Sequence, residues 1–220
     1  MSSAASLATY FIAFMVATEV VRVSRRRGRQ YTSTVVLLRG IRWRHLRAAA
    51  LTIAVTVVSC LVFMQLLSPI PWANTGWWQL LGGTGNVMFA TSEASASATA
   101  PIALRAIPIL IPFALLVIIP SIARLEERMF RRGMQRLPRW KQLRRQLLFG
   151  LVHMIPGVPL SVALGLAVTG VMYLRIYTNA LNDSGSQGIA VLEATRAHTA
   201  ANITLVLIVI AGLVARGLQG

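Results

Sequence analysis

Long apolar runs separated by short basic loops are the feature that most constrains the fold of this chain. The runs are about 17 to 22 residues long, enough for a helix to cross the hydrocarbon core of a bilayer. Hydrophobic residues make up 55% of the 220 residues and charged residues only 13%, too apolar a composition for an ordinary soluble domain. The sequence therefore predicts an all-α fold, a polytopic integral membrane helical bundle.

The net charge of +16 is concentrated in two of the loops. Of the 22 lysines and arginines, 18 lie in residues 22–47 and 124–145. Arginines clustered in short loops keep those loops cytoplasmic and attract anionic lipid headgroups, which we expect as partners. Nucleic acid is not an expected partner, because no basic patch is interleaved with aromatic residues for stacking bases. We expect integration into a membrane, the plasma membrane, with the amino terminus outside and the basic loops cytoplasmic.

The apolar runs predict about six transmembrane helices plus amphipathic surface helices. The fourth and fifth crossings come from one run of about 30 residues that Pro156, Gly157 and Pro159 interrupt. Without that break there are five crossings. The last crossing, which carries His198, would then start from the membrane face opposite to that of Glu126. Both counts stay open, although a site shared by these two residues favours six. The expected crossings are residues 4–23, 48–67, 101–123, 141–155, 158–177 and 197–214.

We expect the chain to divide near residue 100. Residues 1–100 would form a two-span membrane region, with a basic amphipathic inner helix over residues 30–47 and a Trp-rich outer loop over residues 68–100. Residues 101–220 would form the core that carries the polar residues described next. Within this core, residues 124–145 are expected to continue as a surface helix before Pro138, and residues 178–196 to form a polar loop.

Two adjacent glutamates, Glu126 and Glu127, lie where the third apolar run gives way to arginines. A carboxylate near hydrocarbon is costly unless it is paired or has a function. Glu127 precedes Arg131 by four residues, the order that pairs well on a helix. We therefore predict that Glu127 is structural and Glu126 chemical, since a glutamate beside a histidine in a partly desolvated pocket can act as a general base toward water.

Two later pairs of residues are spaced to share one face of a helix. They are Phe149 with His153, and His198 with Asn202, each four residues apart. His153 could share the role of base with Glu126. His198 and Asn202 both offer hydrogen-bond donors that could stabilise a developing oxyanion. Together these residues form a hydrolytic set that needs no serine or cysteine nucleophile.

Three motifs occur in order along residues 125–203. They read Glu-Glu-x-x-x-Arg, Phe-x-x-x-His and His-x-x-x-Asn. In this order, and with membrane spans around them, they resemble the signature motifs of the CAAX protease and bacteriocin-processing (CPBP, Abi) family of intramembrane glutamic proteases. The resemblance implies a CPBP-like multi-helix core. Two departures are the Pro-Gly-Val-Pro break after the second motif and a count of crossings lower than is common in that family.

The resemblance also implies roles for the motif residues. Glu126 and His153 would activate a water molecule. His198 and Asn202 would form the oxyanion hole for a peptide bond of a membrane-anchored, prenylated or peptide substrate. The residues that would support them are Glu127, Arg131 and Phe149.

Two other classes of function stay open. One is a non-catalytic protein of the same fold that serves as a subunit or assembly factor of a larger membrane complex. The other is a zinc-dependent membrane hydrolase with Glu126, His153 and His198 as the metal ligands, which their chemistry permits. The lack of a His-Glu-x-x-His helix makes only one zinc subtype unfavourable. No cofactor is expected for the protease, and zinc is the less favoured alternative.

Overall fold

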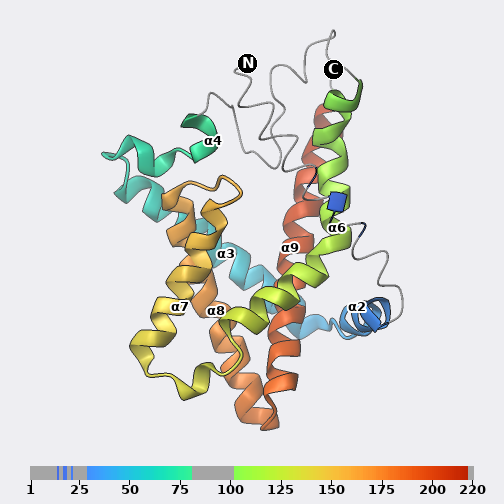
Figure 1. Cartoon of the computed structure of the whole chain (residues 1–220), viewed down its shortest axis with the longest axis vertical. Helices are drawn as coiled ribbons and strands as arrows, with labels where there is room; N and C mark the ends of the chain where they lie inside the picture. Colours follow the sequence, from blue (N-terminus) through green and yellow to red (C-terminus); the bar gives the residue numbers. More distant parts are fainter. Residues whose placement is uncertain (1–13, 15–16, 19–20, 22–28, 81–101, 218–220) are drawn as a thin grey trace.

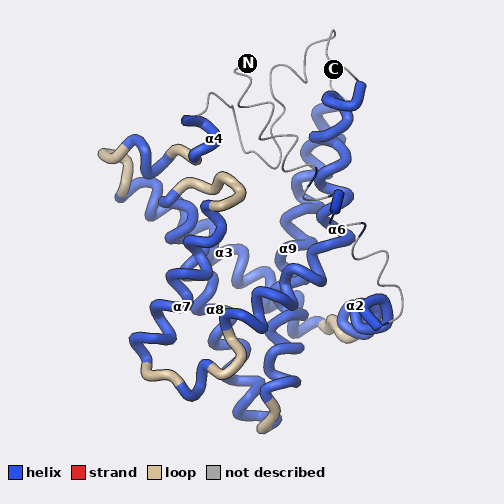
Figure 2. The backbone as a smooth tube through the Cα atoms, in the orientation of Figure 1, coloured by secondary structure: helices blue, strands red, loops and turns tan. Residues whose placement is uncertain are grey.

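The computed structural model describes residues 14, 17–18, 21, 29–80 and 102–217, and within these the secondary structure is entirely helical (Figures 1 and 2). The predicted all-α class is therefore confirmed. The predicted first span, residues 4–23, lies almost entirely outside the described residues, as does the second half of the Trp-rich loop. The main helices are α2 (Arg29–Arg39), α3 (Trp43–Leu66), α4 (Trp77–Leu80), α6 (Ile102–Phe130), α7 (Arg139–Leu151), α8 (Leu160–Ser184) and α9 (Gln187–Gly217). The short 3₁₀ turns are η1 (Pro71–Asn74), η2 (Met134–Arg136) and η3 (Val152–Met154).

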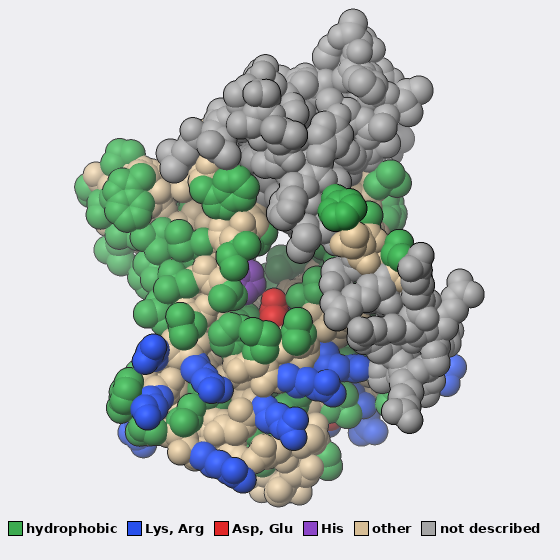
Figure 3. Space-filling model, in the orientation of Figure 1, with side chains coloured by type: hydrophobic (Ala, Val, Ile, Leu, Met, Phe, Trp, Pro, Cys, Tyr) green, Lys and Arg blue, Asp and Glu red, His purple; other side chains and the backbone are tan. Residues whose placement is uncertain are grey.

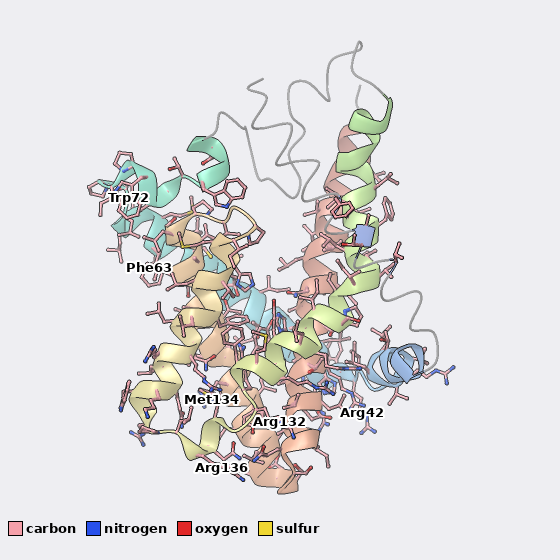
Figure 4. The ribbon with its side chains drawn as sticks, viewed as in Figure 1. Arg42, Phe63, Trp72, Arg132, Met134 and Arg136 are labelled. Carbon is pink, nitrogen blue, oxygen red and sulfur yellow. The ribbon has the colours of Figure 1, made fainter. Side chains whose placement is uncertain are left out.

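Three of the described helices are long and apolar enough to cross a membrane. They are Trp43–Leu66, Leu160–Ser184 and the first 26 residues of α9, Gln187–Gly212. Lysines and arginines gather over one end of the molecule, and hydrophobic side chains cover much of the rest of the face in Figure 3. Trp72 and Arg136 lie toward opposite ends (Figure 4). These helices support integration into a membrane, and the count of about six crossings stays a prediction.

The predicted break at Pro156 is confirmed. Helix α7 ends at Leu151, η3 follows, and the chain turns through Gly157 before α8 begins at Leu160. Gly157 has a φ of 95°, a left-handed conformation that favours glycine. Trp77 donates its indole N–H to the carbonyls of Met154 and Ile155, both at 3.0 Å, and so holds this turn against α4.

The predicted polar loop over residues 178–196 is wrong. Helix α8 continues to Ser184, Gly185 turns the chain with a φ of 65°, and α9 begins at Gln187. Of the polar side chains that suggested a loop, those between residues 178 and 184 are exposed on α8, whereas Glu193 is mostly buried and Thr195 is fully buried on α9. Tyr177 and Ala194 are buried between the two helices. His198 therefore lies more than ten residues into α9, not in its first turn and a half as the predicted span 197–214 implied.

The predicted surface helix over residues 124–145 is also wrong in its boundaries. Helix α6 runs through Pro112 and Pro120 to Phe130 and so includes both glutamates. Proline removes a backbone hydrogen bond and kinks a helix, and Figure 1 shows α6 changing direction along its length. The chain then reverses at Gly133, whose φ is 81°, and a new helix starts only at Arg139. The basic inner helix expected over 30–47 is likewise divided, since α2 ends at Arg39.

Helix α8 lies at the centre of the packing. It contacts α3, α7 and α9, and α6 packs mainly on α9. Glycines allow the close approaches, since a Cβ on Gly165 would lie 2.8 Å from the backbone nitrogen of Cys60 on α3. The buried side of α9 carries small residues, which let helices approach closely in a membrane. Its buried alanines are Ala190, Ala194, Ala197, Ala200 and Ala201.

Candidate active site

Glu127, near the end of α6, lies at the centre of a buried ionic cluster. Its side chain is 0% exposed. Its Oε1 lies 2.9 Å from Nδ1 of His198, and its Oε2 lies 3.4 Å from Nε of Arg131. The predicted pairing of Glu127 with Arg131 is therefore present. The contact with His198 was not predicted, and it gives Glu127 a second partner across α6 and α9.

Arg131 carries the positive charge of this cluster and is also fully buried. Its Nη2 donates to the carbonyl of Gly170 at 3.3 Å, and its guanidinium lies 4.1 Å from the ring centroid of Phe149. Burial lowers the pKa of Arg131, and the negative charges of Glu127 and Glu126 oppose that shift. A charge buried this deeply needs its carboxylate partner. The bonds from Glu127 to His198 and from Arg131 to Gly170 hold the end of α6 to α9 and α8.

Glu126 differs from its neighbour because part of its side chain reaches the surface. The side chain is 19% exposed, and its Oε2 lies 3.5 Å from Nε2 of His198. That oxygen has no hydrogen bond of good geometry within the described part of the chain. Figure 3 shows acidic and histidine side chains in an opening beside hydrophobic side chains. Of the two glutamates, Glu126 is the one that can meet a molecule from outside.

His198 is held between the two carboxylates in one orientation. Since a carboxylate accepts, Nδ1 carries the hydrogen that is donated to Glu127, which leaves Nε2 facing Glu126. The imidazole stacks on Tyr173, with ring centroids 4.3 Å apart and an angle of 23° between the planes. The edge of Phe149 packs on it at 5.9 Å. Aromatic rings therefore fix the imidazole that the carboxylates orient.

His153 lies on the turn η3 and is half-buried. Its Nδ1 donates to the carbonyl of Phe149 at 2.8 Å, because a carbonyl can only accept. Its Nε2 is therefore the nitrogen left for chemistry in the neutral ring. The ring centroids of His153 and Phe149 are 5.1 Å apart. Phe149 thus contacts both His153 and His198. No contact within the described part of the chain joins His153 to Glu126, which it was predicted to face.

Asn202 is the one predicted site residue that the structure does not join to the others by a contact. It lies one turn after His198 on α9 and is partly buried. Its amide has no hydrogen-bond partner within the described ranges. The structure therefore brings together Glu126, Glu127, Arg131 and His198, with Phe149 connecting them to His153, and leaves Asn202 beside this group.

Sequence reasoning missed three residues of α7 and α8 that shape the cluster. Tyr173 stacks on His198, and Gly170 supplies the carbonyl that Arg131 binds. A Cβ on Gly170 would lie 2.9 Å from Cδ1 of Phe149 and 3.1 Å from Oε1 of Gln146, which is itself buried. The available signal was the spacing of Thr169, Gly170, Tyr173 and Tyr177, which places polar and small residues on one face of an apolar helix.

A second ionic cluster, which sequence reasoning also missed, joins α3 to α9 around Glu193. His45 lies 2.8 Å from Glu193, and Arg44 and Arg196 lie 2.6 and 2.7 Å from it. The backbone N–H of Arg42 donates to Nδ1 of His45 at 2.9 Å, so Nε2 carries the hydrogen that Glu193 accepts. A signal for it was present, because His45 is one of only three histidines in the chain.

The same side chains do not form a metal site. Across residues 29–80 and 102–217, no group of three or more His, Cys, Asp or Glu side chains is arranged to hold a metal ion. The trio proposed for zinc, Glu126, His153 and His198, is therefore not gathered as a ligand set in this structure. The single cysteine, Cys60, lies apart on α3 as a free thiol.

Comparison with known proteins identifies no relative of this chain. No protein-family model, no curated protein and no solved structure matches the chain. The resemblance to the CAAX protease and bacteriocin-processing family therefore stays a prediction from three short motifs.

Proposed function

We propose that this protein is an intramembrane endopeptidase of the glutamic type. The observation that carries the proposal is the arrangement of two carboxylates on either side of one imidazole, with Glu127 at Nδ1 and Glu126 at Nε2 of His198. Glu127 is fully buried and paired with Arg131, whereas Glu126 is partly exposed. The arrangement supplies one fixed charge that orients the site and one carboxylate that is available to react.

In this mechanism Glu126 acts as the general base, and His153 assists it through its Nε2. A water molecule gives a proton to Glu126 while its oxygen attacks the carbonyl carbon of the scissile peptide bond. The same proton then passes to the leaving nitrogen as the C–N bond breaks. A partly exposed carboxylate suits this role, because a water molecule that enters the site can give it a proton.

His198 and Asn202 are the proposed donors to the oxyanion. Because Nδ1 of His198 already donates to Glu127, donation to an oxyanion must come from Nε2. In this role the ring would carry a hydrogen on each nitrogen, with Glu127 accepting the one on Nδ1 and the oxyanion accepting the one on Nε2. Asn202 lies one turn farther along the same face of α9, where its side-chain amide would approach a substrate oxygen from the same side.

The position of the site favours a membrane-anchored, prenylated or peptide substrate cleaved near the cytoplasmic face. The glutamates lie at the end of an apolar helix and next to the basic end of the molecule (Figures 1 and 3). By the positive-inside rule that end is cytoplasmic, which places the amino terminus outside if six helices cross the plasma membrane. The alternating directions of α6, α7, α8 and α9 support this topology.

The test is to identify peptides that accumulate when the proposed base is removed. Membranes from cells that produce the wild-type chain or the Glu126→Gln variant are compared for small membrane-bound peptides and uncut proteins. Asp183→Asn is the matched control, because it makes the same chemical change at an exposed residue near the end of α8. We expect uncut substrate in Glu126→Gln alone, and identical profiles in all three would refute the protease.

Two further measurements separate the alternative functions. A non-catalytic subunit would co-purify with a stoichiometric partner, and its complex would assemble normally with Glu126→Gln. A zinc hydrolase would contain stoichiometric zinc after purification and lose cleavage on chelation. The proposed mechanism predicts neither result.

A further inference from the structure

A hollow lined by leucine and by three cations lies on the outer face of α7, away from the candidate active site. Its volume is about 230 Å³. Its lining residues are Leu137, Lys141, Arg144, Arg145 and Leu148. The last four are spaced to share one face of α7, while the opposite face of this helix, with Gln146 and Phe149, is buried against the core.

The start of α7 carries a positive charge that the described chain does not neutralise. The amino-terminal end of a helix is already partly positive and favours acidic residues, but the first turn of α7 contains none. Instead Arg139, Lys141, Arg144 and Arg145 fall within its first seven residues. None of the described carboxylates forms an ion pair with the three cations of the hollow. These like charges repel one another and the partial charge of the helix terminus, and an external anion would reduce that repulsion.

Arg145 connects the hollow to the end of α6. Its Nη1 donates to the carbonyl of Met129 at 3.5 Å and lies 4.0 Å from Sδ of Met134. Met129 follows Glu127 by two residues on α6. An anion in the hollow would therefore neutralise charge where α6 turns toward α7, the two helices that carry Glu127 and Phe149.

The order of side chains along the hollow fits an amphiphile better than a small anion. The cations lie in the first two turns of α7, and Leu148 lies one turn later, in the direction of the apolar part of the helix. Leu143, Leu147 and Leu148 are exposed, and Trp140 is 59% exposed beside Lys141. Tryptophan and long basic side chains are typical of the boundary between headgroups and hydrocarbon. A free phosphate would use the cations but not the leucines.

We propose that this hollow is a binding site for the phosphate headgroup of an anionic phospholipid. Lys141, Arg144 and Arg145 bind the phosphate, and Leu148 contacts the start of the acyl chain. The bound lipid neutralises the positive end of α7 and so stabilises its junction with α6. This site lies outside the proposed catalytic machinery, and its occupancy is measured without any assay of proteolysis.

The experiment compares lipid retention by two variants that lose the same charge. The full chain is reconstituted in phosphatidylcholine nanodiscs with and without phosphatidylglycerol, and lipid bound after transfer to mild detergent is counted by native mass spectrometry. The test variant is Lys141→Gln/Arg144→Gln. The control is Arg132→Gln/Arg136→Gln, since both arginines are exposed on the preceding turn and neither lines the hollow (Figure 4).

We expect the wild-type chain to retain phosphatidylglycerol and the test variant to bind it about 25-fold more weakly, because each cation removed near an anionic headgroup costs about fivefold in affinity. The control should stay within about threefold of the wild type, because its charges are screened from the site. Equal losses in both variants, or no loss in either, would overturn the site. If inorganic phosphate alone displaced the lipid completely, the phosphate-binding cations would stand and the lipid assignment would fall.

Discussion

Two clusters of glutamate, histidine and arginine lie on α9 and use the same residue types in different ways. In the Glu193 cluster both nitrogens of the histidine are occupied, one by the backbone N–H of Arg42 and the other by the carboxylate. In the Glu127 cluster the imidazole of His198 lies between two carboxylates, and one of them, Glu126, is partly exposed. We infer that the Glu193 cluster acts as a clamp, meaning that its bonds only hold α3 to α9. In the Glu127 cluster, the carboxylate of Glu126 can still bind another molecule.

The surroundings of the two clusters differ as well. Glu127 and Arg131 are both 0% exposed, whereas Glu193 is 13% exposed and its partner Arg44 is 59% exposed. A buried ion pair is costly to disrupt because the remaining charge has no water to solvate it. A pair at the surface is worth little because water and salt screen it. The clusters should therefore respond differently to the same substitution, which provides the tests below.

The largest expected effect is on catalysis, and it separates Glu126 from Glu193. Glu126→Gln should lower the cleavage rate by about 10³-fold, since the loss of a general base costs about 10²- to 10⁴-fold. Glu193→Gln should leave the rate within about threefold, because the contacts of that carboxylate with Arg44, His45 and Arg196 only join α3 to α9. Both rates are measured on the substrate identified above, with equal amounts of membrane-inserted protein. A large loss in Glu193→Gln with little in Glu126→Gln would reverse the assignment.

The second effect is on stability, and it concerns the buried Glu127 cluster. Glu127→Gln should lower the free energy of unfolding by about 3 to 5 kcal/mol, because Arg131 would stay buried without its counter-charge. Adding Arg131→Met to this variant should recover part of the loss, since an apolar side chain fits a desolvated site. Denaturant unfolding in mixed micelles measures both variants. If the double variant were no more stable than Glu127→Gln, the buried charge would not be the cause of the loss.

The sequence predicted the class of fold and most members of the site, and its errors have physical reasons. Pro156, Gly157 and Pro159 predicted the break before α8 because proline and glycine act locally. The polar residues 178–196 suggested a loop, but they lie on α8 and α9, and which of them are exposed depends on how Tyr177 and Ala194 pack. Short-range spacing likewise predicted the pair Glu127 and Arg131.

Contacts between distant segments were beyond reach of such reasoning. The bond from Glu127 to His198 spans 71 positions, and the one from His45 to Glu193 spans 148. Nothing in the local pattern around Glu127 indicates which of the three histidines it meets. Tyr173 was missed for the same reason, because an aromatic residue on an apolar helix looks like ordinary core until the histidine against which it stacks is placed.

The third prediction compares two glycines, Gly170 next to the Glu127 cluster and Gly40 next to the Glu193 cluster. A Cβ on Gly170 would crowd the ring of Phe149, which is 1% exposed and packed on several sides. A Cβ on Gly40 would instead overlap the guanidinium of Arg196, the end of a flexible side chain that is 15% exposed. Overpacking in a rigid site costs about 2 kcal/mol, so Gly170→Ala should be destabilising by about that amount. Gly40→Ala should change stability by less than about 0.5 kcal/mol, because Arg196 can move aside. Equal effects in micelle unfolding would show that the two clusters are equally rigid.

The smallest effect concerns His45, which tests whether the Glu193 cluster is only a clamp. His45→Phe keeps an aromatic ring but removes the hydrogen bonds to Arg42 and Glu193. Arg44 and Arg196 would still neutralise Glu193, so the expected loss of stability is about 1 to 2 kcal/mol, the net contribution of two ordinary hydrogen bonds. Cleavage should stay at the wild-type rate at equal amounts of folded protein, because His45 does not contact the Glu126 side of the molecule. His198→Phe is the matched variant on the other cluster, where the same change should abolish cleavage. If His45→Phe also abolished cleavage while the protein remained folded, the two clusters would be parts of one functional unit, and the distinction between clamp and site would fail.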